Sequence, residues 1–128
     1  MTQEDLIGYW EKTAAQDIKV AEDNFKLEHY NYALFFCHLF LERILKALYT
    51  KRKQKLPPPI HNLTKIAKDA GVEMDEKLRA DLDEITTFNV AARYDNVKLA
   101  FYKKATREFA KKYMKRAKEI YLWLKKQL

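Results

Sequence analysis

Three neighbouring residues, Arg93, Tyr94 and Asp95, combine side chains that can bind an anionic ligand. They stand in the segment FNVAARYDN, a break between two stretches whose apolar residues recur at helical spacing. The planar guanidinium of Arg93 suits a phosphate group, and the ring of Tyr94 can stack on a nucleic-acid base. The alternative is structural, with Arg93 paired to a carboxylate and Tyr94 closing the end of a bundle. The residues alone leave both interpretations open.

A second set of candidates lies in and after the most apolar stretch of the chain. Glu42 and Lys46 are four residues apart, which is the spacing of a helical ion pair. An exposed pair adds only a few tenths of a kcal/mol. In an apolar helix, however, the charges would be partly buried, and Glu42 could also reach Arg93. His38 is expected to be an interior histidine with its hydrogen bonds satisfied, and His61 is expected to bond backbone at a helix entrance.

The composition excludes several kinds of site. Gly8 and Gly71 are the only glycines, so a phosphate-binding glycine loop or a dinucleotide fold is excluded. The sequence has no serine, which excludes a Ser-His-Asp triad. The histidines and the single cysteine lack the spacing of a zinc site, and Cys37 is expected to be a buried free thiol. We therefore expect no metal and no cofactor.

Helices must position these candidate residues. With 128 residues, only two glycines and three prolines, and abundant Ala, Leu, Lys and Glu, the chain is expected to form one all-α domain over 1–128. The apolar spacing predicts long helices over 2–28, 32–51 and 97–126, and short helices over 63–70 and from Asp75 to about Phe88. The last helix should bury a stripe that begins at Tyr102. We therefore expect an up-and-down antiparallel bundle of three long and two short helices, with the nearly all-apolar second helix at its centre or at an oligomer interface.

Polar side chains mark the expected starts of these helices. The side chains of Thr2, Asn31, Asn62 and Asp75 can each accept a hydrogen bond from a backbone N–H of the first turn. Asp95 or Asn96 is expected to cap the last helix in the same way. In this interpretation Asp95 has a structural role that is independent of any ligand.

The charge of +7 is concentrated near the end of the chain. Residues 98–126 contain eleven Lys or Arg residues against two glutamates. Such a segment suits a polyanionic or acidic partner, and it also suits a plain solvated helix face. Residues 1–11 are mixed polar, unlike a signal peptide, and no apolar run reaches the roughly 18 residues that a membrane span needs. With one unpaired cysteine, the protein is expected to be soluble and cytoplasmic, with no membrane contact.

Together these segments resemble the HEPN domain, a helical family named for higher eukaryotes and prokaryotes nucleotide-binding. The resemblance covers nearly the whole chain and rests on YALFFCHLFLERILKALY, on PPPIHNL, and on AARY before the last long helix. The residues that stand in the family's places are Ala33, Glu42, Lys46, Ala47, His61 and Leu63.

The resemblance implies a bundle of antiparallel helices that commonly pairs into a homodimer. It also implies a cytoplasmic accessory protein that works with a minimal nucleotidyltransferase, as a toxin and antitoxin pair or as a substrate-binding partner. Many members are metal-independent ribonucleases that use an arginine, four to six residues and then a histidine. Arg93 matches the arginine, but Lys98, Leu99 and Ala100 stand where the histidine would be.

We therefore expect an accessory protein that binds a nucleotide, RNA or a nucleotidyltransferase partner and has no catalysis of its own. The expected binding residues are Arg93, Tyr94, Lys98, His61, Glu42 and Lys46. The alternative is a HEPN toxin ribonuclease in which another base, such as His61, replaces the missing histidine. A purely structural homodimer is a third hypothesis.

Overall fold

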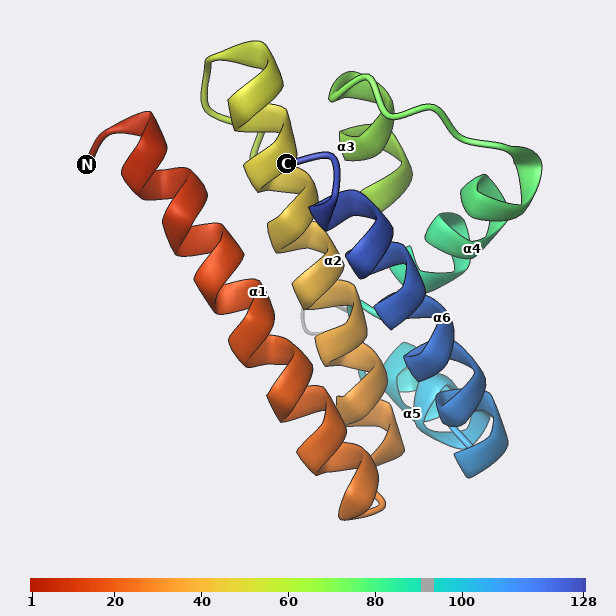
Figure 1. Ribbon diagram of the computed structural model, residues 1–128. Helices are drawn as coiled ribbons and strands as arrows, with labels where there is room; N and C mark the ends of the chain where they lie inside the picture. Colours follow the sequence, from red (N-terminus) through yellow and green to blue (C-terminus); the bar gives the residue numbers. More distant parts are fainter. Residues whose placement is uncertain (91–93) are drawn as a thin grey trace.

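Helix α2 (Tyr30–Lys53) lies at the centre of the fold, with α1 (Gln3–Lys26) and α6 (Arg107–Lys125) packed against it (Figure 1). The structure is a computed structural model, and it describes residues 1–90 and 94–128. The remaining helices of this part are α3 (Leu63–Asp69), α4 (Glu76–Thr86) and α5 (Asp95–Lys104). In Figure 1, α1 runs opposite to α2 and α6, and α3 and α4 carry the chain back toward α5. The predicted all-α helical bundle is confirmed.

Polar caps start three helices where the sequence predicts them, whereas the predicted Asn31 cap is wrong, because α2 begins at Tyr30 after His29 and has no side-chain capping bond. The hydroxyl of Thr2 accepts from the backbone N–H of Asp5, and the carboxylate of Asp5 accepts from the backbone N–H of Thr2. The side chains of Asn62 and Asp75 accept from backbone N–H groups in the first turns of α3 and α4. These bonds satisfy amides that the start of a helix leaves without a carbonyl partner.

The predicted single helix over 97–126 is wrong, because Thr106 divides it into α5 and α6. Thr106 has extended backbone, with φ −77° and ψ 169°, and its hydroxyl accepts from the backbone N–H of Phe109. The residue is therefore the N-cap of a new helix rather than the interior of a long one. The described part of the chain contains six helices where five were predicted.

The start of α5 also differs from the prediction. Tyr94 is its N-cap residue and makes no capping bond with its side chain, so neither Asp95 nor Asn96 caps the helix as expected. The backbone N–H groups of Val97 and Lys98 both lie 3.0 Å from the carbonyl oxygen of Tyr94. Asp95 is the first helical residue, where a negative charge still favours the helix dipole.

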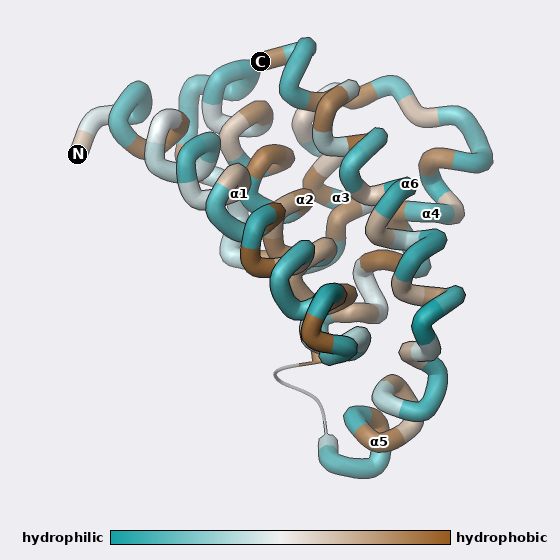
Figure 2. The backbone as a smooth tube through the Cα atoms, turned by 60° about the horizontal axis from the view of Figure 1, so that its bottom comes forward, coloured by the Kyte–Doolittle hydropathy of each residue, from teal (hydrophilic) through white to brown (hydrophobic). Residues whose placement is uncertain are grey.

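The core forms around α2 because this helix is apolar on nearly every side. Phe40 of α2 is fully buried and packs edge-on against Tyr121 of α6, with ring centroids 5.9 Å apart. Phe88, just after α4, is fully buried against rings of α5 and α6, namely Phe101, Phe109 and Tyr113. Each such ring removes enough apolar surface from water to contribute about 1.5–3 kcal/mol. Figure 2 shows α5 at one end of the molecule, away from most of this core.

Candidate functional site

Glu42, Lys46 and His61, three of the predicted site residues, form one hydrogen-bonded group. Glu42 lies in the middle of α2 and is 7% exposed. Its Oε2 accepts from Lys46 Nζ at 2.9 Å, which confirms the predicted ion pair. Its Oε1 lies 2.9 Å from His61 Nδ1, so this ring nitrogen donates to the carboxylate. Both oxygens of a buried carboxylate are thus satisfied, as burial requires.

His38 completes this group from the interior of α2. Its ring is buried, and Nε2 lies 2.8 Å from the backbone carbonyl oxygen of His61. Since a carbonyl only accepts, Nε2 carries the donated proton. The prediction of a satisfied interior histidine is confirmed. His61 differs from its prediction, because its ring binds the Glu42 carboxylate and only its carbonyl takes part in a bond to the helix.

Burial and hydrogen bonding shift the pKa values of two members of this group. Burial alone would raise the pKa of Glu42, but the hydrogen bonds from Lys46 and His61 outweigh it and hold the pKa below its ordinary value. Burial lowers the pKa of His38, and its bond to the His61 carbonyl and the charge of Glu42 offset this only in part. At neutral pH Glu42 is therefore a carboxylate and His38 is uncharged.

A hollow of about 410 Å³ lies beside this group, between α1, α2 and the connector after α2. Its walls include Tyr9, Trp10, Leu39 and Lys46, together with the prolines 57–59. The charged residues in its lining already have partners inside the protein, because Glu42 binds Lys46 and Arg43 pairs with Asp17 at 2.8 Å. The hollow is therefore nearly neutral and mostly apolar. The hydrogen-bonded group of Glu42, Lys46 and His61 therefore has a structural role, because it joins α2 to the connector.

A second hollow, of about 460 Å³, lies between the first turns of α2 and the helix α5, and we call it the α2–α5 groove. It is lined by Asn31, Tyr32, Phe35, Phe36, Val90, Lys98, Leu99, Phe101 and Tyr102. The side of the groove toward solvent is aromatic, since Tyr32 is 57% exposed and Tyr102 is 63% exposed. Lys98 is also exposed and supplies a cation at this surface.

The structure places the predicted site residues in two separate groups. Lys98 lines the α2–α5 groove, and Tyr94 stands exposed at the start of the same helix. Glu42 and Lys46 line the other hollow. Arg93 lies outside the described residues, so its predicted contact with a ligand or with Glu42 stays a prediction.

Sequence reasoning missed the aromatic residues of the α2–α5 groove. Tyr32 and Phe35 belong to a helix that is apolar all round, so spacing alone does not show which side remains uncovered. Tyr102 was expected in a buried stripe, and it is exposed because α5 ends at Lys104 and turns a different side to the core. Phe101, its neighbour, is the residue of α5 that is buried.

The described residues offer few sites for other chemistry. Among residues 1–90 and 94–128, no three or more His, Cys, Asp or Glu side chains are grouped to hold a metal ion. Cys37 is a buried free thiol, as predicted; its Sγ lies 3.3 Å from Met114 Sδ, and burial raises its pKa. Within the same part of the chain, no helix has both the length and the apolar composition that a membrane crossing requires.

Comparison with protein families matches residues 7–127 to the HEPN domain. The chain belongs to the HEPN family. This HEPN chain also resembles a solved structure, the crystal structure of TT1696 from Thermus thermophilus, with a TM-score of 0.81. The two sequences are 19% identical, and the likeness covers 95% of this chain and 98% of the other, which supports the fold. No curated protein sequence matches the chain.

We predict that Glu42→Gln destabilises this HEPN domain by about 1–3 kcal/mol, because Lys46 and His61 would lose a buried charged acceptor. Chemical denaturation followed by circular dichroism measures the change. Asp69→Asn, which removes the more exposed Lys65–Asp69 pair, is the matched control and should leave stability nearly unchanged. Equal effects of the two substitutions would show that the Glu42 group does not tie the connector to α2.

We also predict that stability falls as the pH drops below about 6.5, through the burial of His38. The pKa of His38 is lower in the folded protein than in the unfolded chain, so in this range the unfolded chain binds more protons. The stabilisation is complete when the pH is above the pKa of His38 in the unfolded chain. It is lost as the pH falls through the lower pKa of His38 in the folded protein.

Urea denaturation between about pH 7.5 and 5.5 tests this, with His38→Gln as the comparison. The glutamine amide can still donate to the His61 carbonyl but does not titrate, so the variant should show the smaller loss of stability. Identical pH profiles for the two proteins would contradict the assignment to His38.

Proposed function

We propose that this HEPN protein is an accessory protein that binds a nucleotide through the α2–α5 groove and acts with a minimal nucleotidyltransferase partner. The observation that carries the proposal is the pairing of exposed aromatic rings with a cation around one groove. Tyr32 and Tyr102 offer faces on which a base can stack, and Lys98 offers charge for a phosphate.

The groove also adjoins the segment that the sequence singles out. Val90, which lines the groove, and Tyr94, at the start of α5, stand on either side of residues 91–93. Arg93, which matches the arginine of the family's nuclease motif, immediately precedes Tyr94 in the sequence. Its guanidinium would add a second, planar contact for phosphate.

The lining of the groove supports binding rather than catalysis. Its described residues contain a lysine, tyrosines and an asparagine, but neither a histidine nor a carboxylate. Histidine and carboxylate side chains are the ones that most often act as general bases. His61, the substitute base in the ribonuclease alternative, bonds to Glu42 beside the other hollow and does not line the α2–α5 groove. These features favour the accessory role over the ribonuclease.

The exposed apolar residues around the groove also support association with a second copy. Tyr32 and Phe35 lie on the uncovered side of α2, and Leu99 of α5 is 55% exposed. A patch of this kind on a small domain usually marks an interaction surface. We propose a homodimer formed at this side, with the groove of each copy near the contact.

Nucleotide binding is tested with ATP by calorimetric titration. Arg93→Ala, Lys98→Ala and Tyr102→Ala should each weaken binding by about 1–3 kcal/mol, because each removes a charged or stacking contact to the nucleotide. Their melting temperatures should stay nearly unchanged. Lys125→Ala, at the far end of α6, is the control and should bind as the parent does.

Two outcomes would contradict this proposal. If Arg93→Ala lowers the melting temperature by many degrees and leaves ATP binding intact, the arginine has a structural role. If the protein cleaves structured RNA without metal and Arg93→Ala abolishes the cleavage, the ribonuclease alternative replaces the accessory role.

The homodimer is tested by light scattering at micromolar concentration. The parent protein should have about twice the 15.3 kDa mass of the chain. Leu99→Glu should shift it toward the monomer, because a charge in an apolar contact is costly to bury. Lys103→Glu, also exposed on α5, is the control for the added charge. A parent protein that is monomeric would remove the homodimer proposal.

A further inference from the structure

A third hollow, of about 460 Å³, runs between α1 and α6, and we call it the α1–α6 groove. Helix α1 contributes Glu22, Phe25 and Lys26, and helix α6 contributes Lys111, Met114, Lys115, Lys118, Glu119 and Leu122. On α6, these residues recur at three and four, so they follow one side of the helix. The groove shares no residue with the α2–α5 groove.

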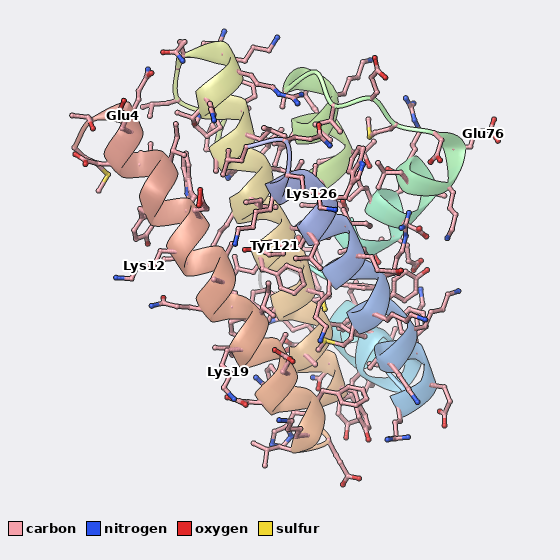
Figure 3. All side chains as sticks on the ribbon, in the orientation of Figure 1. Glu4, Lys12, Lys19, Glu76, Tyr121 and Lys126 are labelled. Carbon is pink, nitrogen blue, oxygen red and sulfur yellow. The ribbon has the colours of Figure 1, made fainter. Side chains whose placement is uncertain are left out.

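The floor of the α1–α6 groove is apolar and open to solvent in part. Met114 is nearly buried, whereas Leu122 is 57% exposed. Phe25 is half-buried, and its ring packs edge-on against Tyr30 with centroids 5.4 Å apart. Figure 3 shows Tyr121 between α1 and α6, over α2, where the two helices flank the same surface. An exposed leucine on such a floor leaves apolar surface for another molecule to cover.

The rim of the groove carries more positive charge than the protein neutralises. Lys118 pairs with Glu22 across the groove at 3.3 Å. Lys26, Lys111 and Lys115 are exposed and make no ion pair with any described residue. Among the described residues, three unpaired ammonium groups, against the single unpaired carboxylate of Glu119, leave the lining net positive around an apolar floor. Such a surface would attract an occupant that is apolar on one side and acidic at its edges.

We propose that the α1–α6 groove docks an acidic amphipathic helix of another protein. A groove between two helices is the shape that a third helix fills, with its apolar side chains on the floor and its charges at the rim. The lining of α6 extends from Lys111 to Leu122, which is about three helical turns. The docked helix would place Asp or Glu residues beside Lys26, Lys111 and Lys115.

Other occupants fit this surface less well. A second copy of the chain, docked through the same surface, would bring the unpaired lysines of the two copies together. A nucleic acid would meet Glu22 and Glu119 in the lining, and Phe25 is its single aromatic side chain. Single-stranded nucleic acids are usually bound on several stacking rings in a positively charged groove. The mixture of apolar floor and cationic rim therefore favours a protein helix.

The probe is a fluorescein-labelled designed peptide of about three helical turns, with a leucine stripe flanked by glutamates. Fluorescence anisotropy should show saturable binding that weakens as salt is added. A matched peptide with glutamine in place of glutamate should bind at least about tenfold more weakly, because it lacks the charges that pair with the rim. Failure of the glutamate peptide to bind would overturn the proposal.

Protein variants locate the binding. The double variant Lys111→Glu, Lys115→Glu and the single variant Leu122→Asp should each weaken peptide binding at least about tenfold. Lys12→Glu is the control, because Figure 3 shows Lys12 pointing away from the bundle on α1. The substituted positions are all exposed, and thermal melting confirms that the variants fold. Equal binding by the parent and the groove variants would overturn the assignment.

Two further measurements separate helix docking from the binding of nucleotides or RNA. Binding of ATP should be unchanged in the α1–α6 groove variants, so the nucleotide proposal and this one can fail independently. A labelled single-stranded RNA serves as the competing probe. If the lysine variants lose RNA binding and the glutamate peptide does not bind, the groove is a nucleic-acid surface and the helix-docking proposal is wrong.

Discussion

The carboxylate of Glu42 is the charged group on which the arrangement around α2 depends. A nearly buried carboxylate is stable only when its oxygens are hydrogen-bonded, and Lys46 and His61 supply those bonds. Because His61 lies beyond the three prolines, this requirement fixes the path of the connector. His38 also binds this part of the connector, because its Nε2 donates to the backbone carbonyl of His61. The Glu42 group therefore ties the residue just before the cap of α3 to α2, and the buried Leu63 and Ile66 of α3 add apolar packing.

The grooves exist because the neighbours of α2 do not cover it evenly. Helices α1 and α6 cover most of its length, while α5 reaches only one end. At that end Tyr32 and Phe35 remain partly exposed, although they belong to the most apolar helix of the chain. The α1–α6 groove arises differently, since two helices that both pack on α2 barely touch each other. The grooves and the core are therefore made from the same helices, α1, α2, α5 and α6.

The sequence predicts the helices and the local pairs well, and the contacts between distant segments poorly. The Glu42–Lys46 pair follows from a spacing of four, and the caps at Thr2, Asn62 and Asp75 follow from side-chain chemistry in the first turn. The bond between Glu42 and His61 joins residues that are nineteen positions apart, so it depends on the path of the connector. The spacing of apolar residues along the chain does not predict the path of that connector. Which side of an all-apolar helix stays exposed is likewise decided by its neighbours.

The break at Thr106 shows how a single cap changes a surface. In an unbroken helix, Tyr102 would share a stripe with Phe109 and Tyr113, which pack against the core. Because Thr106 starts a new helix, α5 takes its own direction, buries Phe101 and leaves Tyr102 exposed beside Lys98. The apolar stripe of α6 then remains in the core while its lysines line the α1–α6 groove. The cap at Thr106 therefore gives α5 and α6 separate directions, with the aromatic α2–α5 groove on one and the basic α1–α6 groove on the other.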